Sequence, residues 1–288
     1  MASIVPGYAM TNIFNVLIRF ACLGLSLFLV GCAAGPTQLP YPAFVDVDEL
    51  VDVFIAGMPG IRAKSLAGDP TTRRSSNRII LPADWQFTTG ASPGMSAELF
   101  VLEGEIRLGD LALQAGGYAY IPSGSTGMSM STRDGAVLLY FVDEMNPSSV
   151  IQTPLIQSSN LLEWRPVSTE MSDIGLSVKE LRADPGSGAR TWLLKVDPIA
   201  MQSWRQSSVT KEGYLVSGNY RASECWQGEP VTEDYLPGGY FYRPPGAVHG
   251  GAEEKSTGVS IWFMRTLEHE TVKNVAGCML LPETNLIN

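Results

Sequence analysis

The feature that most constrains how this chain folds is an internal repeat whose two copies lie about 115 residues apart. The offset is nearly constant within each aligned block and increases once, between Gly218 and Gly238, so the second copy carries a longer loop there. The aligned blocks are 60–70 with 175–185, 98–104 with 212–218, 116–124 with 238–246, and 135–141 with 258–264. A repeat of this length is a domain rather than a solenoid unit, so the sequence predicts two copies of one fold.

Each copy is expected to consist of short β-strands. Runs rich in branched and aromatic side chains are bounded by Gly, Pro, Ser or Asp, as strands and turns require. In the first copy these runs are Arg78–Leu81, Leu99–Leu102, Tyr118–Ile121 and Val137–Phe141. The 29 glycines and 19 prolines also favour many turns, so the sequence predicts an all-β body. Residues 45–56 allow either a short helix or a strand, and their pattern does not decide between the two.

The amino-acid composition and net charge argue against a disordered chain and against a nucleic-acid partner. With 45% apolar and 17% charged residues, the chain can bury a core and is not a disordered tail. The formal net charge is -9, and no cluster of Lys and Arg offsets it. An acidic surface repels phosphate backbones, so we expect no nucleic-acid partner.

The N-terminal segment is typical of an exported protein with a lipid anchor. Residues 20–32 form an uncharged, mostly apolar run that is too short for a membrane helix and suits a secretory signal. The run ends in Leu-Val-Gly-Cys, which resembles the lipobox of bacterial lipoproteins. We therefore expect a signal peptide at 1–31, a lipid on Cys32 and a tether at 32–44. The alternative is an ordinary signal peptide with an incidental cysteine.

A lipid on the cysteine implies a location in the cell envelope, with a membrane as partner. Ala33 rather than Asp follows the cysteine, so we expect the outer membrane, with the protein facing the periplasm. In that oxidising compartment Cys225 and Cys278 either form a disulfide or remain two separate buried thiols. Their spacing leaves both alternatives open.

A polar stretch between the two copies gives the domain boundaries. Residues 146–160 are uncharged and contain two prolines, which is typical of a linker. The first copy is then expected at 45–145, and the second copy with a C-terminal extension at 161–288.

Two sequence motifs resemble the paired motifs of the cupin superfamily. A strand ending in V-L-E-G-E at 101–105 is followed, about eleven residues later, by G-G-Y-A-Y-I-P-S-G at 116–124. The resemblance covers most of 60–142 and 175–265 and is to secreted two-cupin bacterial proteins of unassigned function. It implies two tandem cupin (double-stranded β-helix) barrels, in which alternate side chains point inward. The Glu-x5-Gly spacing also resembles that of the zinc-dependent anti-sigma cupins.

The first copy lacks the histidines of the cupin metal-binding pattern. The family pattern has His-x-His and a Glu before the first strand-turn glycine, and a final His after P-x-G. Here the His-x-His region is 91–96, the Glu position is Ala97 or Glu98, and Gly127 replaces the final His. We expect no transition metal in this copy.

The second copy keeps a single imidazole. Its His-x-His region, 204–208, contains no histidine, its Glu position is Lys211 or Glu212, and His249 occupies the final position. One imidazole and at most one carboxylate are fewer than the three protein ligands of a catalytic zinc or iron site. We therefore expect no metal cofactor, and His249 is the one candidate ligand for a metal.

A small-molecule site is expected around His249 in the second barrel. Neighbouring strand residues face opposite sides, so only one of Lys211 and Glu212 faces His249, and the register is left open. Lys211 would favour an anionic ligand, whereas Glu212 would pair with the imidazole and make His249 and Glu212 candidates for acid–base catalysis. The alternative for His249 is a relic ligand that packs in the barrel mouth. The candidate ligand-binding residues are Trp204, Gln206, Lys211, Glu212, Tyr240, Tyr242 and His249.

These observations predict a membrane-tethered protein that binds a small, anionic or carbohydrate-like ligand without metal. The alternative is a cupin enzyme, acting as a lyase, isomerase or dioxygenase on a small substrate in the second barrel. The first copy is expected to be structural and either to pack against the second or to form an oligomer contact, as in a homodimer. His269 lies among acidic residues outside the repeat and is expected in solvent.

Overall fold

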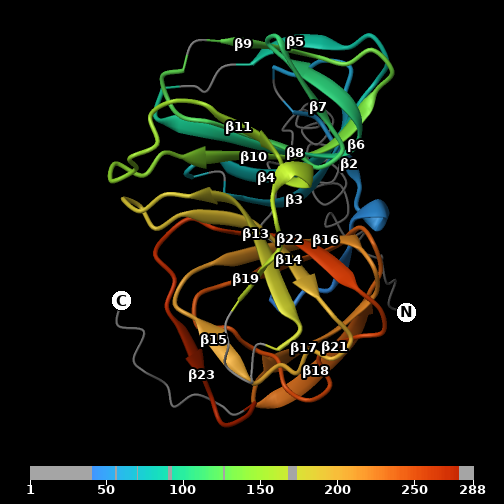
Figure 1. Ribbon diagram of the computed structural model, residues 1–288, viewed down its shortest axis with the longest axis vertical. Coiled ribbons are helices and arrows are strands. Elements are labelled where there is room, and N and C mark those ends of the chain that lie inside the picture. The colour runs from blue at the N-terminus through green and yellow to red at the C-terminus, as the bar shows by residue number, and fades with distance from the viewer. Residues whose placement is uncertain are drawn as a thin grey trace, which may run out of the picture. The chain divides into compact units, whose positions relative to one another are not determined.

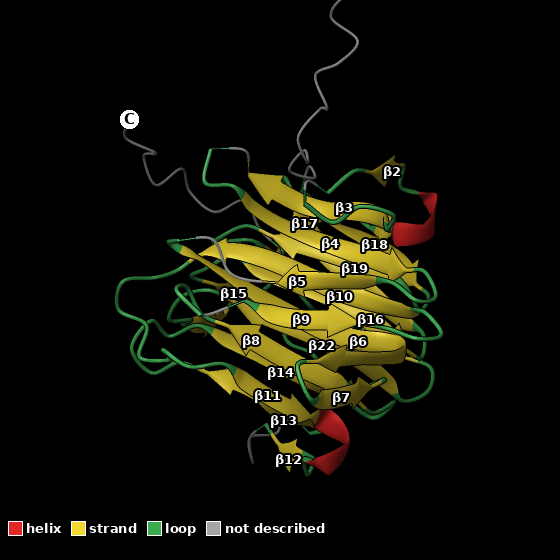
Figure 2. Cartoon of the chain, turned by 90° about the horizontal axis from the view of Figure 1, so that it is seen from above, coloured by secondary structure: helices red, strands yellow, loops and turns green. Residues whose placement is uncertain are grey.

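The computed structural model describes residues 41–55, 57–69, 71–89, 93–125, 127–167 and 174–278. The expected signal peptide, Cys32 and residues 33–40 of the expected tether lie outside these ranges. Within them the chain is all-β, as the sequence predicts, and its helical elements are two 3-10 turns, η1 (Val47–Glu49) and η2 (Ser159–Leu161) (Figure 2).

The first copy builds a 10-stranded sheet, drawn in the upper half of Figure 1. The main path runs in the order β11 (Leu155–Ser158), β8 (Gly117–Ile121), β6 (Met95–Leu108), β10 (Ala136–Glu144), β4 (Arg74–Leu81), β3 (Arg62–Asp69) and β2 (Asp52–Val53). Three further strands pair off this path: β5 (Gln86–Thr89), β7 (Leu111–Gln114) and β9 (Met128–Ser131).

The second copy builds a 7-stranded and a 6-stranded sheet, drawn in the lower half of Figure 1. The larger sheet has the order β1 (Val45–Asp46), β19 (Gly239–Arg243), β16 (Lys211–Ser217), β22 (Ser260–Thr266), β14 (Arg190–Val196), β13 (Leu176–Ala183) and β12 (Arg165–Pro166). The smaller sheet has the order β18 (Glu229–Tyr235), β17 (Tyr220–Trp226), β20 (Val248–His249), β15 (Arg205–Ser207) and β23 (Val272–Asn274), and β21 (Lys255–Ser256) pairs with β17.

The main path of the first copy and the larger sheet of the second match strand for strand, so the sequence repeat is a structural repeat. Both copies need the glycine of the Glu-x5-Gly spacing, which lies within β6 in the first copy and directly after β16 in the second. Gly104 and Gly218 have φ angles of 77° and 84°, a region that favours glycine. A Cβ would lie 2.4 Å from the Gly135 carbonyl oxygen at Gly104, and 2.3 Å from the Val259 carbonyl oxygen at Gly218.

The segment before each copy adds a strand to the other copy. β1 precedes the first copy but pairs with β19 of the second, whereas β11 precedes the second copy but pairs with β8 of the first. Residues 45–46, expected in the first barrel, thus belong to a sheet of the second, and the expected linker 146–160 contains β11 and the first two residues of η2. Neither short strand has the length or alternation that would reveal it in the sequence.

Apolar side chains fill the space between the two copies because strand alternation gives each central strand two buried faces. In β10, Leu138 points into the first barrel, whereas Phe141 points toward the second copy. There the Phe141 ring stacks on the Phe263 ring at 5.5 Å, and Phe100 lies 5.1 Å from Phe263. The first copy therefore packs against the second, one of the two roles expected for it.

A disulfide and a hydrogen bond from Tyr41 add further contacts that involve the second copy. Cys225 in β17 and Cys278 are joined by a disulfide, which resolves the alternative that the sequence left open. Tyr41, within the expected tether, donates a hydrogen bond of 2.9 Å to Glu224 of the second copy. Among the described residues, no helix has the length and apolar character needed to cross a bilayer.

Candidate functional site

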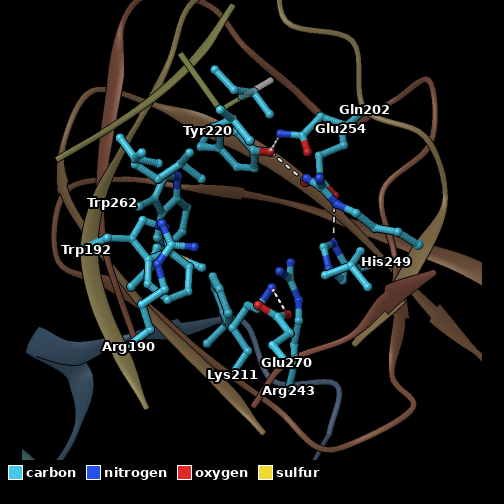
Figure 3. A pocket seen from close by; sticks show the side chains of 18 residues that line it. Arg190, Trp192, Gln202, Lys211, Tyr220, Arg243, His249, Glu254, Trp262 and Glu270 are labelled. Carbon is cyan, nitrogen blue, oxygen red and sulfur yellow. Dashed lines mark hydrogen bonds and ion pairs between the residues drawn. The ribbon is translucent and has the colours of Figure 1, made fainter. Parts of the chain in front are cut away.

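A cavity of about 230 Å³ lies inside the second barrel. Its apolar wall comes from inward side chains of β13, β14, β19 and β22, including Trp192, Phe241 and Trp262. Its polar wall comes from β15, β16, β17, β20 and the adjoining loops. Figure 3 shows Trp192 and Trp262 on one side of the cavity and His249 on the opposite side.

Lys211 lines this cavity, and Glu212 does not. Glu212 points to the space between the copies, where its carboxylate accepts hydrogen bonds from Ser76 (2.6 Å) and Tyr240 (2.8 Å). The Lys211 ammonium forms an ion pair with Glu270, which also lines the cavity. Burial lowers the pKa of Lys211, and the Glu270 carboxylate opposes part of that shift. The cavity therefore carries a cation at the Glu position of the cupin pattern.

His249 is 4% exposed and faces Glu254, with 3.8 Å between its Nδ1 and the Glu254 Oε2. This distance is too long for a hydrogen bond. Burial and the nearby charge of Arg243 lower the pKa of His249, so the imidazole is neutral at pH 7. Burial alone would raise the pKa of Glu254, but its interactions with His249, Arg243 and Arg205 outweigh burial and lower it. Glu254 is therefore a buried, ionised carboxylate.

A chain of hydrogen bonds fixes the orientation of Glu254. The Tyr220 hydroxyl donates to Glu254 Oε1 at 2.6 Å and accepts from Gln202 Nε2 at 2.7 Å (Figure 3). All three side chains line the cavity. The chain uses one oxygen of Glu254 and leaves Oε2 free.

Four buried polar atoms of the cavity lining have no hydrogen-bond partner among the described residues. They are Gln202 Oε1, His249 Nδ1, Glu254 Oε2 and Glu270 Oε1, and the last of these belongs to the ion pair with Lys211. Buried polar atoms of folded proteins are almost always hydrogen-bonded, so a cluster of exceptions in one cavity marks the place of a ligand or of ordered water.

The cationic groups of the cavity differ in their partners. Arg243 binds Glu224, with 2.8 Å from Nε to Oε1, and Lys211 pairs with Glu270. Arg190 forms a 3.1 Å ion pair with Glu180 at a more exposed position. In the described part of the chain, Arg205 has no carboxylate within ion-pair distance. Its strand partner in β20 is His249, so the two side chains lie next to each other on one face.

In the first barrel, the described residues at the corresponding positions form an apolar core instead of a polar cavity wall. Ala97, at the Glu position of the cupin pattern, is 5% exposed and packs in an apolar cluster with Leu99, Val101 and Leu138. Glu98 points the other way, and its carboxylate lies 3.4 Å from Arg182 in the space between the copies.

The residues at the cupin metal positions do not fit a divalent cation. Arg205 lies in the His-x-His region, Lys211 holds the Glu position, and both side chains line the cavity next to His249. The charge of the Arg205 guanidinium and that of the Lys211 ammonium paired with Glu270 repel a metal ion, and neither group is a ligand while protonated. Within the described residues, no three His, Cys, Asp or Glu side chains gather as a metal site would require.

The sequence pattern of a family described as "Domain of unknown function (DUF4437)" matches residues 45–270. The chain belongs to this family. No curated protein matches this DUF4437 chain.

Solved structures share the fold of the DUF4437 chain at low sequence identity. A "putative dioxygenase" from Nostoc punctiforme is 20% identical, with a TM-score of 0.66 over 81% of this chain and 86% of that chain. Protein YlbA from E. coli is 17% identical, with a TM-score of 0.63 over 81% and 95%. An oxalate decarboxylase from Lactobacillus farciminis is 10% identical, with a TM-score of 0.59 over 83% and 90%. These likenesses confirm the expected cupin fold and concern the fold alone.

The structure separates the predicted site residues of the DUF4437 chain into two groups. His249 and Lys211 line the cavity, whereas Glu212, Tyr240 and Tyr242 lie on the opposite face, between the copies. Strand alternation is the reason. Since Lys211 points into the barrel, its neighbour Glu212 points outward, and on the paired strand β19 the odd-numbered residues point inward.

The remaining two predicted residues, Trp204 and Gln206, are half-buried beside Arg205 and do not line the cavity. Sequence reasoning missed the residues Gln202, Arg205, Tyr220, Arg243, Glu254 and Glu270, all of which do line it. Alternation from Lys211 could have found Arg243, its cross-strand partner. Glu254 and Glu270 lie outside regular strands, so no periodic signal marks them.

Proposed function

We propose that this protein binds a small polar ligand in the second barrel and uses its own cationic side chains where the cupin pattern places metal ligands. The observation that carries the proposal is the cluster of partnerless buried atoms on Gln202, His249 and Glu254 facing one cavity. Leaving such atoms unpaired costs about 1–3 kcal/mol each, a cost that a bound ligand removes.

Ligand binding can be tested by screening small metabolites for thermal stabilisation of chelator-treated protein. A ligand that binds only the folded state raises its melting temperature. We expect a hit with wild-type protein that is lost in His249→Ala and kept in His269→Ala, a matched control because His269 is exposed. Equal stabilisation of His249→Ala would make His249 a structural relic and would contradict the proposed site.

Independence from metal is a separate part of the proposal. Elemental analysis of protein purified without chelator is expected to show well under one equivalent of any transition metal. Chelator treatment should leave the melting temperature unchanged. A stoichiometric metal whose removal abolishes ligand binding would contradict this part.

We also place the protein at the cell envelope, anchored by a lipid on Cys32. The Leu-Val-Gly-Cys motif supports the anchor, and the Cys225–Cys278 disulfide is typical of proteins in an oxidising compartment. A ligand would then be taken from the periplasmic side.

An enzyme is the second candidate, favoured by the neutral, partnerless His249 Nδ1 beside the Glu254 carboxylate. The free ring nitrogen can accept a proton from a bound substrate during a reaction, and the lowered pKa of His249 makes the imidazole a weak base that releases the proton again. Incubation of each ligand hit with excess protein, followed by mass spectrometry, would detect turnover. If the ligand is unchanged after prolonged incubation, the function is binding alone.

A further inference from the structure

The cavity wall that faces His249 is apolar and aromatic, which suits a flat apolar group of a ligand. Trp192, Phe241, Trp262 and Met264 are each at most 6% exposed and all line the cavity. The Trp262 ring lies 5.3 Å from the Phe241 ring at a 53° angle, so these rings hold each other in place. Flat apolar ligand surface is what such a wall buries best.

Around Glu254 the opposite wall presents free oxygen acceptors. Glu254 Oε2 and Gln202 Oε1 are both free, and the Tyr220 hydroxyl that joins the two side chains is already engaged. His249 Nδ1 lies 3.8 Å from Glu254 Oε2, too far for a direct bond but close enough for one ligand atom to contact both. A hydroxyl or an amino group can donate to Glu254 and exchange a second hydrogen bond with His249.

A cationic group lies directly beside this acceptor pair. Arg205 is the cross-strand partner of His249, and within the described residues no carboxylate lies within ion-pair distance of it. A guanidinium binds a carboxylate through two parallel hydrogen bonds, which fixes both position and orientation. The anion of a ligand would therefore sit next to the group that contacts His249 and Glu254.

We infer that the ligand is a small hydroxy- or amino-carboxylate with an apolar, flat body. In this arrangement Arg205 holds the carboxylate, Glu254 and His249 hold the neighbouring hydroxyl or amino group, and Trp192 and Trp262 contact the body. This inference rests on the proposed binding function and names the chemical class of its ligand.

The experiment compares probes that each lack one of the three features. Isothermal titration of chelator-treated full-length protein would use 3-phenyllactate and phenylalanine as complete probes. The matched probes are 3-phenylpropanoate without the hydroxyl, 3-phenylpropane-1,2-diol without the carboxylate, lactate without the apolar body, and glucose as a neutral carbohydrate. We expect a complete probe to bind roughly 10- to 100-fold more tightly than each matched probe.

Two variants assign the preference to residues. Arg205→Gln should weaken binding of the complete probe to the level of the diol and leave the affinity for the diol unchanged. The control is Arg221→Gln, because Arg221 is in an exposed ion pair with Asp234, and it should leave both affinities unchanged. Glu254→Gln should remove the advantage of 3-phenyllactate over 3-phenylpropanoate. Because the probe comparison uses wild-type protein, a variant that fails to fold does not decide the outcome.

The experiment gives different results if the proposed ligand class is wrong and if the proposed binding function is wrong. Diol or glucose binding as tightly as the complete probes, with loss in His249→Ala, overturns the carboxylate class and keeps the binding function. Absence of binding for all these probes, together with no hit in the wider thermal screen, overturns both.

Discussion

Lys211 and Glu212 are adjacent in the chain and have opposite roles in the structure. Lys211 lines the cavity, and Glu212 holds the two copies together through Ser76 and Tyr240. A one-residue difference in strand register separates a ligand site from a packing contact. The functional importance of a charged strand residue therefore depends on which face it occupies.

Glu212→Gln should lower stability without affecting the ligand site. The charged acceptor of two hydrogen bonds becomes a neutral one, so we expect a loss of about 1–3 kcal/mol in unfolding free energy and less than a twofold change in ligand affinity. Denaturant unfolding and calorimetric titration measure the two effects. A large loss of affinity with unchanged stability would show that Glu212 belongs to the site.

Asp184 provides a pH-dependent part of the stability. Burial would raise the pKa of its carboxyl, but the nearby Ser149 hydroxyl and hydrogen bonds from backbone amides, including those of Val150 and Gly186, lower it to about 2. An unfolded Asp titrates near 3.9, so this stabilisation is complete above about pH 4 and is lost as pH falls toward 2.

Asp184→Asn should therefore destabilise the protein by about 1–3 kcal/mol at pH 7, and the difference from wild type should shrink between pH 4 and pH 2. Unfolding curves recorded across this range measure the difference. Asp134→Asn is a matched control, because Asp134 is exposed and should show no such trend. A difference that stays constant with pH would show that the Asp184 charge is not involved.

At this scale the sequence predicts part of the site. It singles out His249 and the Lys211 position because the repeat aligns them with a known motif, but it does not reveal the free oxygens of Gln202 and Glu254. Those oxygens become visible only when the hydrogen-bond chain through Tyr220 is known. Loop residues that converge on a cavity from distant parts of the chain carry no periodic signal.

At the scale of elements, the long strands can be predicted from the sequence, whereas β1 and β11, which each pair with the other copy, cannot. β10 and β22 stand out in the sequence because their residues are branched or aromatic. β1 has only two residues and β11 only four, and their place is set by pairing with distant strands rather than by local pattern. Residues 45–56, which the sequence left undecided, form β1, η1 and β2 in their described part.

The Cys225–Cys278 disulfide links β17 to the segment after β23 and closes a loop with a sequence separation of 53. Replacing both cysteines with serine should lower the unfolding free energy by about 2–4 kcal/mol, because the unfolded chain regains loop entropy. A reductant should destabilise wild type by a similar amount and leave the double variant unchanged. Equal stability of wild type and variant under oxidising conditions would mean that the bond does not form.

At the scale of the whole molecule, the two copies are predicted to stay together after the chain is cut. The stacked rings of Phe141 and Phe263 and the pairs of β1 with β19 and β11 with β8 all join them. A protease site inserted at 146–150 should, after cleavage, give two fragments that elute as one species. Separation of the fragments without denaturant would show that the covalent connection is required.

Attachment to the membrane is a separate prediction at this scale. Cys32→Ser should move the protein from the membrane fraction to the soluble fraction, because the thiol that carries the lipid is gone. Metabolic labelling with a fatty acid should mark wild type only. An unchanged membrane fraction for the variant would exclude an anchor at Cys32.

The pairing of β1 with the second copy also determines which barrel would bear a mechanical force applied to the N-terminal side of the chain. Tyr41 is bonded to Glu224, and β1, which follows it, lies beside β19 in the barrel that is last in the sequence. Glu224 in turn binds Arg243 on the cavity wall. A pull on the N-terminal side of Tyr41 would therefore act on the second barrel before the first one, through contacts that lead to a residue of the cavity wall.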